Sequence, residues 1–247
     1  MSGQNELILL ASVVVIFGTA LLAYKYFGRA GLYCVSAVAT VLANIEVLIM
    51  IKAFGLSQTL GNVLFAVTFL ITDILSECEG REHANKAVMM GIFTSVFFLV
   101  VSQSWLLYVP SSEDWAMGAI TEIFSNTPRM VLASLSVYAI SQAFDVWLYH
   151  KWWKLTEKKS GSKRKYLWLR NNGSTLVSQL INTVLFNVIA FAGTYDFKTV
   201  MEIIGSSYII FVFTSLLDTP AVYIARRISD RKKGLLMPNS GFGYKKQ

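Results

Sequence analysis

Residues 59 to 78 read TLGNVLFAVTFLITDILSEC, an apolar run that is long enough to cross a bilayer and carries an aspartate at position 73. Asp145 and Asp218 lie inside two further runs of the same kind. A carboxylate that faces lipid near a helix centre costs about 3 kcal/mol, so three would cost about 9 kcal/mol. We therefore expect all three aspartates to face inward, toward a polar cavity.

The composition is that of an integral membrane protein. Of 247 residues, 54% are hydrophobic and 15% are charged, against about 25% charged in soluble domains. The gaps between apolar runs are short, which predicts a single all-α transmembrane domain over residues 1–247 with no soluble catalytic domain. We expect that the protein is not an enzyme. The seven expected spans are Leu7–Phe27, Gly31–Ala53, Thr59–Cys78, Ala87–Val109, Met130–His150, Gly173–Gly193 and Thr199–Ala225.

The 22 Lys and Arg residues alternate by side. Nineteen follow the first, third, fifth and seventh runs, and only Lys52, Arg129 and Lys198 lie in the other connections. Because basic loops stay in the cytoplasm, we expect an external N-terminus, a cytoplasmic C-terminus and multi-pass insertion in the cytoplasmic (inner) membrane. This distribution favours the lipid bilayer, and not nucleic acid, as the partner of the net charge of +7.

The sequence contains no clear signal for a disulfide, a metal site, a cofactor or a cleaved leader. Cys34 and Cys78 fall at expected cytoplasmic helix ends, where thiols stay reduced, and no Cys or His cluster has metal-ligand spacing. We expect no disulfide, metal or cofactor. The first run lacks a positive leader and exceeds a signal-peptide core in length, so we expect it to be retained. Mixed polarity around Trp115 predicts a short interfacial helix.

A short internal similarity relates VLANI, at residues 41–45, to VLFNV, at residues 184–188. Asn44 and Asn187 in these segments precede Asp73 and Asp218 by 29 and 31 residues. The similarity is compatible with two parallel three-helix repeats, a design found in transporters.

Polar side chains accompany the aspartates. Asp73 and Glu77 lie one turn apart on one helical face, and Gln142 and Asp145 share another face. Two stacked carboxylates would repel unless a cationic or hydrogen-bonding group lies between them. The sixth run carries a polar stripe at spacings of three and four residues: Thr175, Ser178, Gln179 and Asn182.

Each of these groups has an alternative interpretation. Neutral polar side chains in membrane helices often join helices, at about 0.6 kcal/mol each. Glu77 and Arg170 are near enough to the interface to snorkel into water. Asn44 is expected near the middle of the second span, and Pro220 is expected to free a carbonyl within the last. An ionisable group at the depth of the aspartates favours a substrate, ion or proton pathway.

At these residues the chain resembles the queuosine precursor transporter family, also called vitamin-uptake-transporter-like (VUT family). The resemblance rests on ITDILSE at residues 71–77, SQAFDV at 141–146, WLRNNGSTLVSQ at 168–179 and LLDTPAVY at 216–223, and extends from about Gly31 to Arg227. It implies import of a 7-deazaguanine base such as preQ0, preQ1 or queuine. The candidate substrate-binding residues are then Asn44, Asp73, Glu77, Gln142, Asp145, Arg170, Asn171, Asn172, Ser174, Thr175, Ser178, Gln179, Asn182 and Asp218.

Two positions depart from the family pattern. Relatives carry Asp at the position of Asn182 and an aromatic residue at that of Glu79, so one ionisable group is neutral here and an acid is added.

The candidate residues have the chemistry that a 7-deazaguanine base requires. A carboxylate can accept the two neighbouring donors of a guanine edge, an amide can serve its O6, and a second carboxylate can offset a cationic aminomethyl group.

Three functions remain open at this point. The first is a transporter that works alone, as a monomer or a homodimer, with a coupling proton or ion, because the chain contains no GxxxxGK[ST] phosphate loop. The second is the substrate-capturing subunit of an energy-coupling-factor complex. The third is an intramembrane aspartyl protease, which the lack of a GxGD string disfavours.

Overall fold

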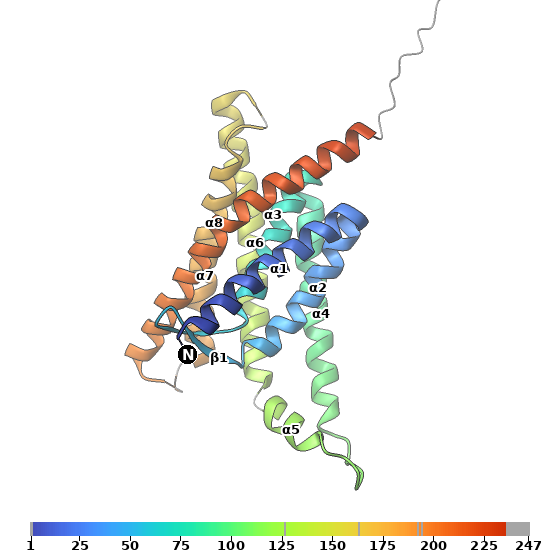
Figure 1. Cartoon of the computed structure of the whole chain (residues 1–247), viewed down its shortest axis with the longest axis vertical. Coiled ribbons are helices and arrows are strands. Elements are labelled where there is room, and N and C mark those ends of the chain that lie inside the picture. Colours follow the sequence, from blue (N-terminus) through green and yellow to red (C-terminus); the bar gives the residue numbers. More distant parts are fainter. Residues whose placement is uncertain (1, 126, 163, 192, 194, 236–247) are drawn as a thin grey trace, which may run out of the picture.

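The computed structural model describes residues 2–125, 127–162, 164–191, 193 and 195–235, and within these it is a bundle of helices (Figure 1). The all-α class expected from the sequence is confirmed. The elements are α1 (Ser2–Phe27), α2 (Arg29–Glu46), β1 (Met50–Ala53), β2 (Leu56–Thr59), α3 (Asn62–Cys78), α4 (Arg81–Trp105), α5 (Met117–Ser125), α6 (Thr127–Ser160), α7 (Leu167–Phe191) and α8 (Phe197–Leu235).

Four helices in the described part of the chain are long and apolar enough to cross a membrane, namely α1, α4, α7 and α8. The protein is therefore a multi-pass membrane protein. Helix α3 has 17 residues, at the lower limit of what a bilayer core requires, because a helix rises 1.5 Å per residue. The number of seven spans and their orientation stay predictions.

The second expected span is shorter than predicted. Helix α2 ends at Glu46, and Met50–Ala53 pairs antiparallel with Leu56–Thr59 in a two-stranded hairpin. Phe54 and Gly55 form its turn with φ of 53° and 76°, the left-handed pair that a two-residue hairpin requires and that glycine favours. The prediction for Asn44 was consequently wrong: it lies in the last turn of α2, not near the middle of a span.

The bundle has two distinct ends. The hairpin, α5 and the start of α1 lie at one end, which we call the hairpin end (Figure 1). The α1–α2, α3–α4 and α6–α7 connections and the C-terminal part of α8 lie at the other, which we call the basic end because it carries most of the Lys and Arg residues. Lys163, Lys245 and Lys246 of that set lie outside the described residues.

Two helices extend beyond the predicted spans at the basic end. Helix α6 continues to Ser160 and α8 to Leu235, and α8 passes through Pro220 as one helix instead of breaking there. The extension of α8 reaches back to the bundle: Lys232 Nζ donates to the Tyr24 carbonyl at 2.7 Å, and Lys233 Nζ to the Cys78 carbonyl at 2.8 Å. These ammonium groups satisfy carbonyls at the C-terminal ends of α1 and α3, where cations are favoured.

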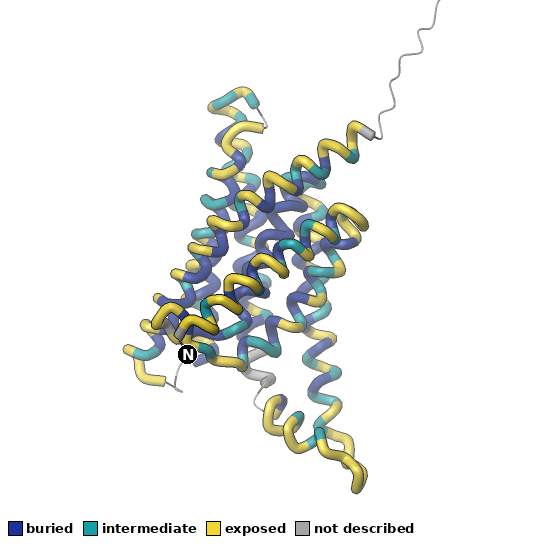
Figure 2. The backbone as a smooth tube through the Cα atoms, viewed as in Figure 1, coloured by how far each residue is buried: buried dark blue, intermediate teal, exposed yellow. Residues whose placement is uncertain are grey.

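Helix α3 is the core of the bundle. Every residue of it except Glu77 is buried, and it packs against α1, α2, α4, α6 and α8 (Figure 2). Ordinary amphipathic helices expose one face, whereas a helix surrounded by others has none to expose. Any polar residue on α3 therefore faces protein, which places Asp73 in the interior.

Candidate functional site

Asp73, Asp145 and Asp218, here called the acid cluster, come from α3, α6 and α8 and meet in the interior. Each has an exposed fraction of 0%. Asp73 interacts electrostatically with both of the others, and Asp218 interacts with Asp145. The expectation that the three aspartates face inward is confirmed, and the bundle brings together acids that are 72 and 73 residues apart in the sequence.

Most of the carboxylate oxygens in the cluster lack a partner. Asp73 Oδ2 accepts a hydrogen bond from Thr175 Oγ1 at 2.9 Å. Asp73 Oδ1 and both oxygens of Asp145 and Asp218 have no hydrogen-bond partner among the described residues, and no salt bridge there reaches any of the three. Ser174, Ser178 and the carboxyl group of Asp73 are neighbours of Asp145, and none of them completes a hydrogen bond to it. Buried charges without partners are costly, so this arrangement is suited to a ligand and not to stability.

Two buried glutamine side chains differ in whether they are hydrogen-bonded. Gln142 is held: its Nε2 donates to Thr68 Oγ1 at 2.7 Å, and its Oε1 accepts from Thr72 Oγ1 at 3.1 Å. Gln179 is fully buried, and neither its Oε1 nor its Nε2 has a hydrogen-bond partner in the described structure. Asn171 Oδ1 and Ser141 Oγ are unpartnered in the same way. The site thus offers donors as well as acceptors.

Helix α8 is fixed beside Asp218 by the two asparagines of α7. Asn171 Nδ2 and Asn172 Nδ2 both donate to Thr219 Oγ1, at 3.3 and 2.7 Å, and Ser215 Oγ donates to Asn172 Oδ1 at 3.3 Å. Asn171 and Asn172 are therefore hydrogen-bonded between helices, and they set the position of Asp218 without satisfying its oxygens.

Glu77 is the centre of a second buried group, the Glu77 network. Arg170 donates to it through Nε at 2.9 Å and through Nη2 at 2.6 and 2.7 Å, and Tyr149 Oη donates at 2.8 Å. Arg226 Nη1 lies 3.3 Å from Glu77 Oε1, and the Arg170 guanidinium lies 4.3 Å from the ring centroid of Trp153. The Arg170 and Glu77 side chains are only 0% and 2% exposed.

The Glu77 network bears on two expectations from the sequence, the snorkelling of Glu77 and Arg170 and the need for a cation beside Asp73 and Glu77. Snorkelling of Glu77 and Arg170 was wrong, because both side chains are buried and bind each other. The cation needed beside the stacked pair Asp73 and Glu77 is Arg170, and it neutralises Glu77 alone. A cavity of about 290 Å³ on the basic side of Glu77 is lined by Arg226, Ser229 and Lys233, among others.

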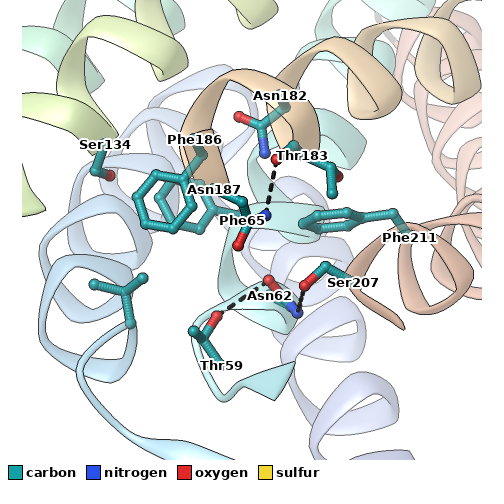
Figure 3. Close-up of a pocket in the computed structure, with 11 residues that line it drawn as sticks. Thr59, Asn62, Phe65, Ser134, Asn182, Thr183, Phe186, Asn187, Ser207 and Phe211 are labelled. Carbon is teal, nitrogen blue, oxygen red and sulfur yellow. Dashed lines mark hydrogen bonds between the residues drawn. The ribbon is translucent and has the colours of Figure 1, made fainter. Parts of the chain in front are cut away.

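A small enclosed cavity lies toward the hairpin end (Figure 3). Its volume of about 10 Å³ would hold roughly one water molecule. Three phenylalanines form part of its wall, and the remainder is almost entirely neutral and polar: Val47, Thr59, Asn62, Ser134, Asn182, Thr183, Asn187 and Ser207, beside Phe65, Phe186 and Phe211. Asn62 bonds to Gln58, Thr59 and Ser207 at 3.3 to 3.4 Å, near the limit for a hydrogen bond.

The candidate residues thus separate into groups. Asn182 lines the hairpin-side cavity, and Asn44 donates to Ser95 on α4, so neither is bonded to the acid cluster. Glu77 and Arg170 belong to the Glu77 network. The members in or beside the cluster are Asp73, Gln142, Asp145, Asn171, Asn172, Ser174, Thr175, Ser178 and Asp218. Gln179 follows Thr175 by one turn of α7.

Several participating residues were not predicted from the sequence. Thr68 and Thr72 share a face of α3 and orient Gln142, while Thr219 anchors both asparagines. Tyr149 follows Asp145 by one turn, a spacing that could have indicated it, although its aromatic ring is also typical of an interface. Arg226 was counted only as a topology signal.

The fold and the buried acids define a multi-pass helical membrane protein with a polar interior. Comparison with known proteins identifies the family: the family model described as "Putative vitamin uptake transporter" matches residues 59–225. "Probable queuosine precursor transporter" of Bacillus subtilis (strain 168) is 38% identical over 215 residues, 87% of this chain and 92% of that protein. The chain belongs to this family, as its motifs predicted, and is a membrane transporter.

The comparisons also decide between the alternatives. A transporter family is not a family of enzymes, as expected, which removes the protease hypothesis. Neither comparison supports the energy-coupling-factor subunit. No solved structure matches the chain at a significant level.

Proposed function

We propose that this transporter imports a queuosine precursor, a 7-deazaguanine base, and binds it at the acid cluster. The observation that carries the proposal is the five unpartnered carboxylate oxygens of three fully buried aspartates. The family membership and the name of the Bacillus subtilis relative support the choice of ligand.

The chemistry of the base complements that of the site. The N1 and exocyclic amino donors of a 7-deazaguanine lie side by side, so one carboxylate can accept both in a bidentate pair. Asp73 is suited to this role because Thr175 fixes one of its oxygens and leaves the other free. The unpartnered amide of Gln179 can donate to the O6 acceptor of the same base.

The route of the base runs along α3 from the hairpin end to the basic end. At the hairpin end the cavity presents Phe65, Phe186 and Phe211, and aromatic faces stack on planar rings. The weakly bonded Asn62 there can release its partners to a ligand at low cost. With the basic end in the cytoplasm, the Glu77 network lies on the exit side of the acid cluster.

Energy for accumulation comes from a proton or ion gradient, or from consumption of the base after uptake. Three buried acids without a basic partner carry protons or a cation when no base is bound, since three ionised carboxylates cannot coexist there. Exchange of that proton or cation for substrate would couple the two movements. Both the monomer and the homodimer are compatible with this scheme.

Uptake of labelled base by cells that lack their own transporter tests the proposal. We expect competition by preQ0, preQ1 or queuine and weak competition by guanine, and we expect loss of accumulation when the proton gradient and membrane potential are collapsed. Asp73→Asn should reduce uptake at least tenfold at equal expression, whereas the exposed Asp230→Asn serves as a control. Unchanged uptake in Asp73→Asn, Asp145→Asn and Asp218→Asn alike would refute the site.

A further inference from the structure

A second cavity opens at the basic end, between the end of α3 and the extension of α6. Its volume is about 260 Å³, and its wall consists of Ser76, Gly80, His150, Trp153, Lys154 and Glu157. The four wall residues of α6 recur at spacings of three and four, so they form one face of that helix. None of the three aspartates of the acid cluster lines this cavity, which is therefore a separate feature.

Two buried polar atoms in its wall have no hydrogen-bond partner in the described part of the chain. They are Oγ of Ser76, whose residue is 1% exposed, and Nε2 of His150. Hydroxyl groups in helices usually donate to a carbonyl of the preceding turn, as Thr72 does on the same helix. Both unpartnered atoms can donate to a ligand, the imidazole nitrogen in one of its two tautomers.

The charged groups around this wall favour an anion. Those that act on His150 are Arg81, Lys154 and Arg170, each of them a cation. Arg170 is committed to the Glu77 network, but neither Arg81 nor Lys154 forms a salt bridge with a described residue. Two cations thus remain to neutralise a ligand.

The N-terminus of α4 adds positive potential at the same place. Gly80 in the cavity wall precedes this helix and provides no side-chain cap, so the N–H groups of the first turn are left for water or a ligand. Two acids, Glu82 in that turn and Glu157 in the wall, lower the net charge. A compact anion that accepts several hydrogen bonds at once fits such a wall, and phosphate has this chemistry.

The position of the cavity favours a lipid as the source of the phosphate. Trp147, one turn before the cavity face of α6, is 42% exposed, and Lys151 Nζ lies 4.6 Å from its ring centroid. An exposed tryptophan beside a lysine is typical of the level at which lipid headgroups lie. With the basic end in the cytoplasm, the cavity opens at the leaflet that carries anionic lipids.

We propose that this cavity binds the phosphate of an anionic phospholipid headgroup, with Ser76, His150 and Lys154 as its contacts. The site does not depend on which base the protein transports. A lipid bound there joins the ends of α3 and α6 and stabilises the folded protein, because it binds the folded state alone.

Thermal denaturation of the purified protein in a neutral detergent tests the proposal. Short-chain phosphatidylglycerol, phosphatidylcholine of the same chain length and inorganic phosphate are added separately at equal concentrations and ionic strength. We expect a saturable rise in the denaturation temperature with phosphatidylglycerol and little change with the other two. An equal rise with phosphatidylcholine would overturn the preference for an anion, and an equal rise with inorganic phosphate would overturn the lipid as occupant.

Two variants test the assigned contacts. Lys154→Gln should weaken the apparent affinity for phosphatidylglycerol about fivefold, the factor that one basic residue contributes near an anionic surface. Ser76→Ala should weaken it about tenfold, because a hydrogen bond to a charged group is lost while no charge of the protein changes.

The matched control is Lys159→Gln, on the opposite face of α6 and outside the cavity wall. It should leave the affinity unchanged, and a loss equal to that of Lys154→Gln would show a general attraction to basic residues and overturn the site. Unchanged affinity in Ser76→Ala would overturn the role of that hydroxyl group. The comparison of lipids on the wild type does not depend on whether a variant folds.

Discussion

The acid cluster comes from α3, α6 and α8, the Glu77 network comes from these helices and α7, and the two groups differ in nearly every electrostatic respect. Asp73 and Glu77 are four residues apart on α3, as Asp145 and Tyr149 are on α6. Glu77 has two arginines and a tyrosine as partners, whereas the three aspartates share a single hydrogen bond from Thr175. The three aspartates are fully buried, and in the Glu77 network Arg170 and Glu77 are nearly as buried, while the Arg226 side chain is 16% exposed.

The two regions differ in whether their buried charged groups have partners. A buried ion pair with all its hydrogen bonds made is self-sufficient, and removing one partner leaves an uncompensated charge. A buried group of carboxylates without partners has no structural purpose, because apolar residues would pack there at lower cost. The Glu77 network therefore joins the four helices, and the acid cluster, one turn away, is the place where we propose that the base binds.

The largest expected effect comes from Arg170→Met. Loss of the guanidinium leaves Glu77 buried with Arg226 as its remaining cation, and breaking a buried pair typically costs about 3–5 kcal/mol. We expect a strong fall in the thermal denaturation temperature in detergent. The double variant Arg170→Met with Glu77→Met should recover most of that loss, and a double variant as unstable as the single one would contradict the role of uncompensated charge.

Substitutions in the acid cluster are expected to change stability in the opposite direction from Arg170→Met. Asp145→Asn and Asp218→Asn each remove a buried ionisable group, so we expect stability to be unchanged or to rise by about 1–2 kcal/mol while transport falls. Thermal denaturation measured beside uptake on the same preparation separates the two readouts. A fall in stability as large as that of Arg170→Met would mean that the cluster is structural.

Tyr149→Phe is expected to lower stability, as Arg170→Met does, but by a smaller amount. It removes one of the donors to Glu77 and keeps the ring that packs near His150 and Trp153. Loss of a hydrogen bond to a charged group costs about 1.5–3 kcal/mol, and here the two arginines continue to satisfy Glu77, which favours the lower limit. A chemical denaturation midpoint identical to that of the wild type would contradict this.

The smallest effect is expected at the basic end, outside the buried region. Arg164 and Asp230 form a salt bridge of 2.6 Å whose side chains are 67% and 47% exposed. Exposed pairs contribute about 0–1 kcal/mol and are screened by salt. Arg164→Ala should therefore leave both stability and uptake within error, which makes it the reference for nonspecific loss of a basic residue.

The sequence predicted the helices more accurately than their ends. Hydropathy located each long apolar helix, but it assigned Met50–Ala53 to a span, because Met50 and Ile51 are apolar and only the turn at Phe54 and Gly55 marks a hairpin. It also ended α6 and α8 where apolarity ends, although both helices continue through basic residues. A helix needs no apolar residues once its backbone is satisfied internally.

For the candidate site, too, the sequence predicted some features and missed others. Depth and charge alone selected Asp73, Asp145 and Asp218, since no lipid-facing position accepts a carboxylate at low cost. The motifs added the asparagines and serines of α7. Nothing in the sequence indicated that Glu77 and Arg170, 93 residues apart, would bind each other and not a substrate.

The sequence by itself therefore determined that this protein is a helical membrane protein with acids in its interior, because both properties follow from the cost of placing a residue in hydrocarbon. That it is a transporter was indicated by the motifs that it shares with its family. Which acids are neutralised and which are left unpartnered was decided by the tertiary structure alone. Pairing of buried charges depends on distances of a few ångströms between helices, and the packing around α3 sets those distances.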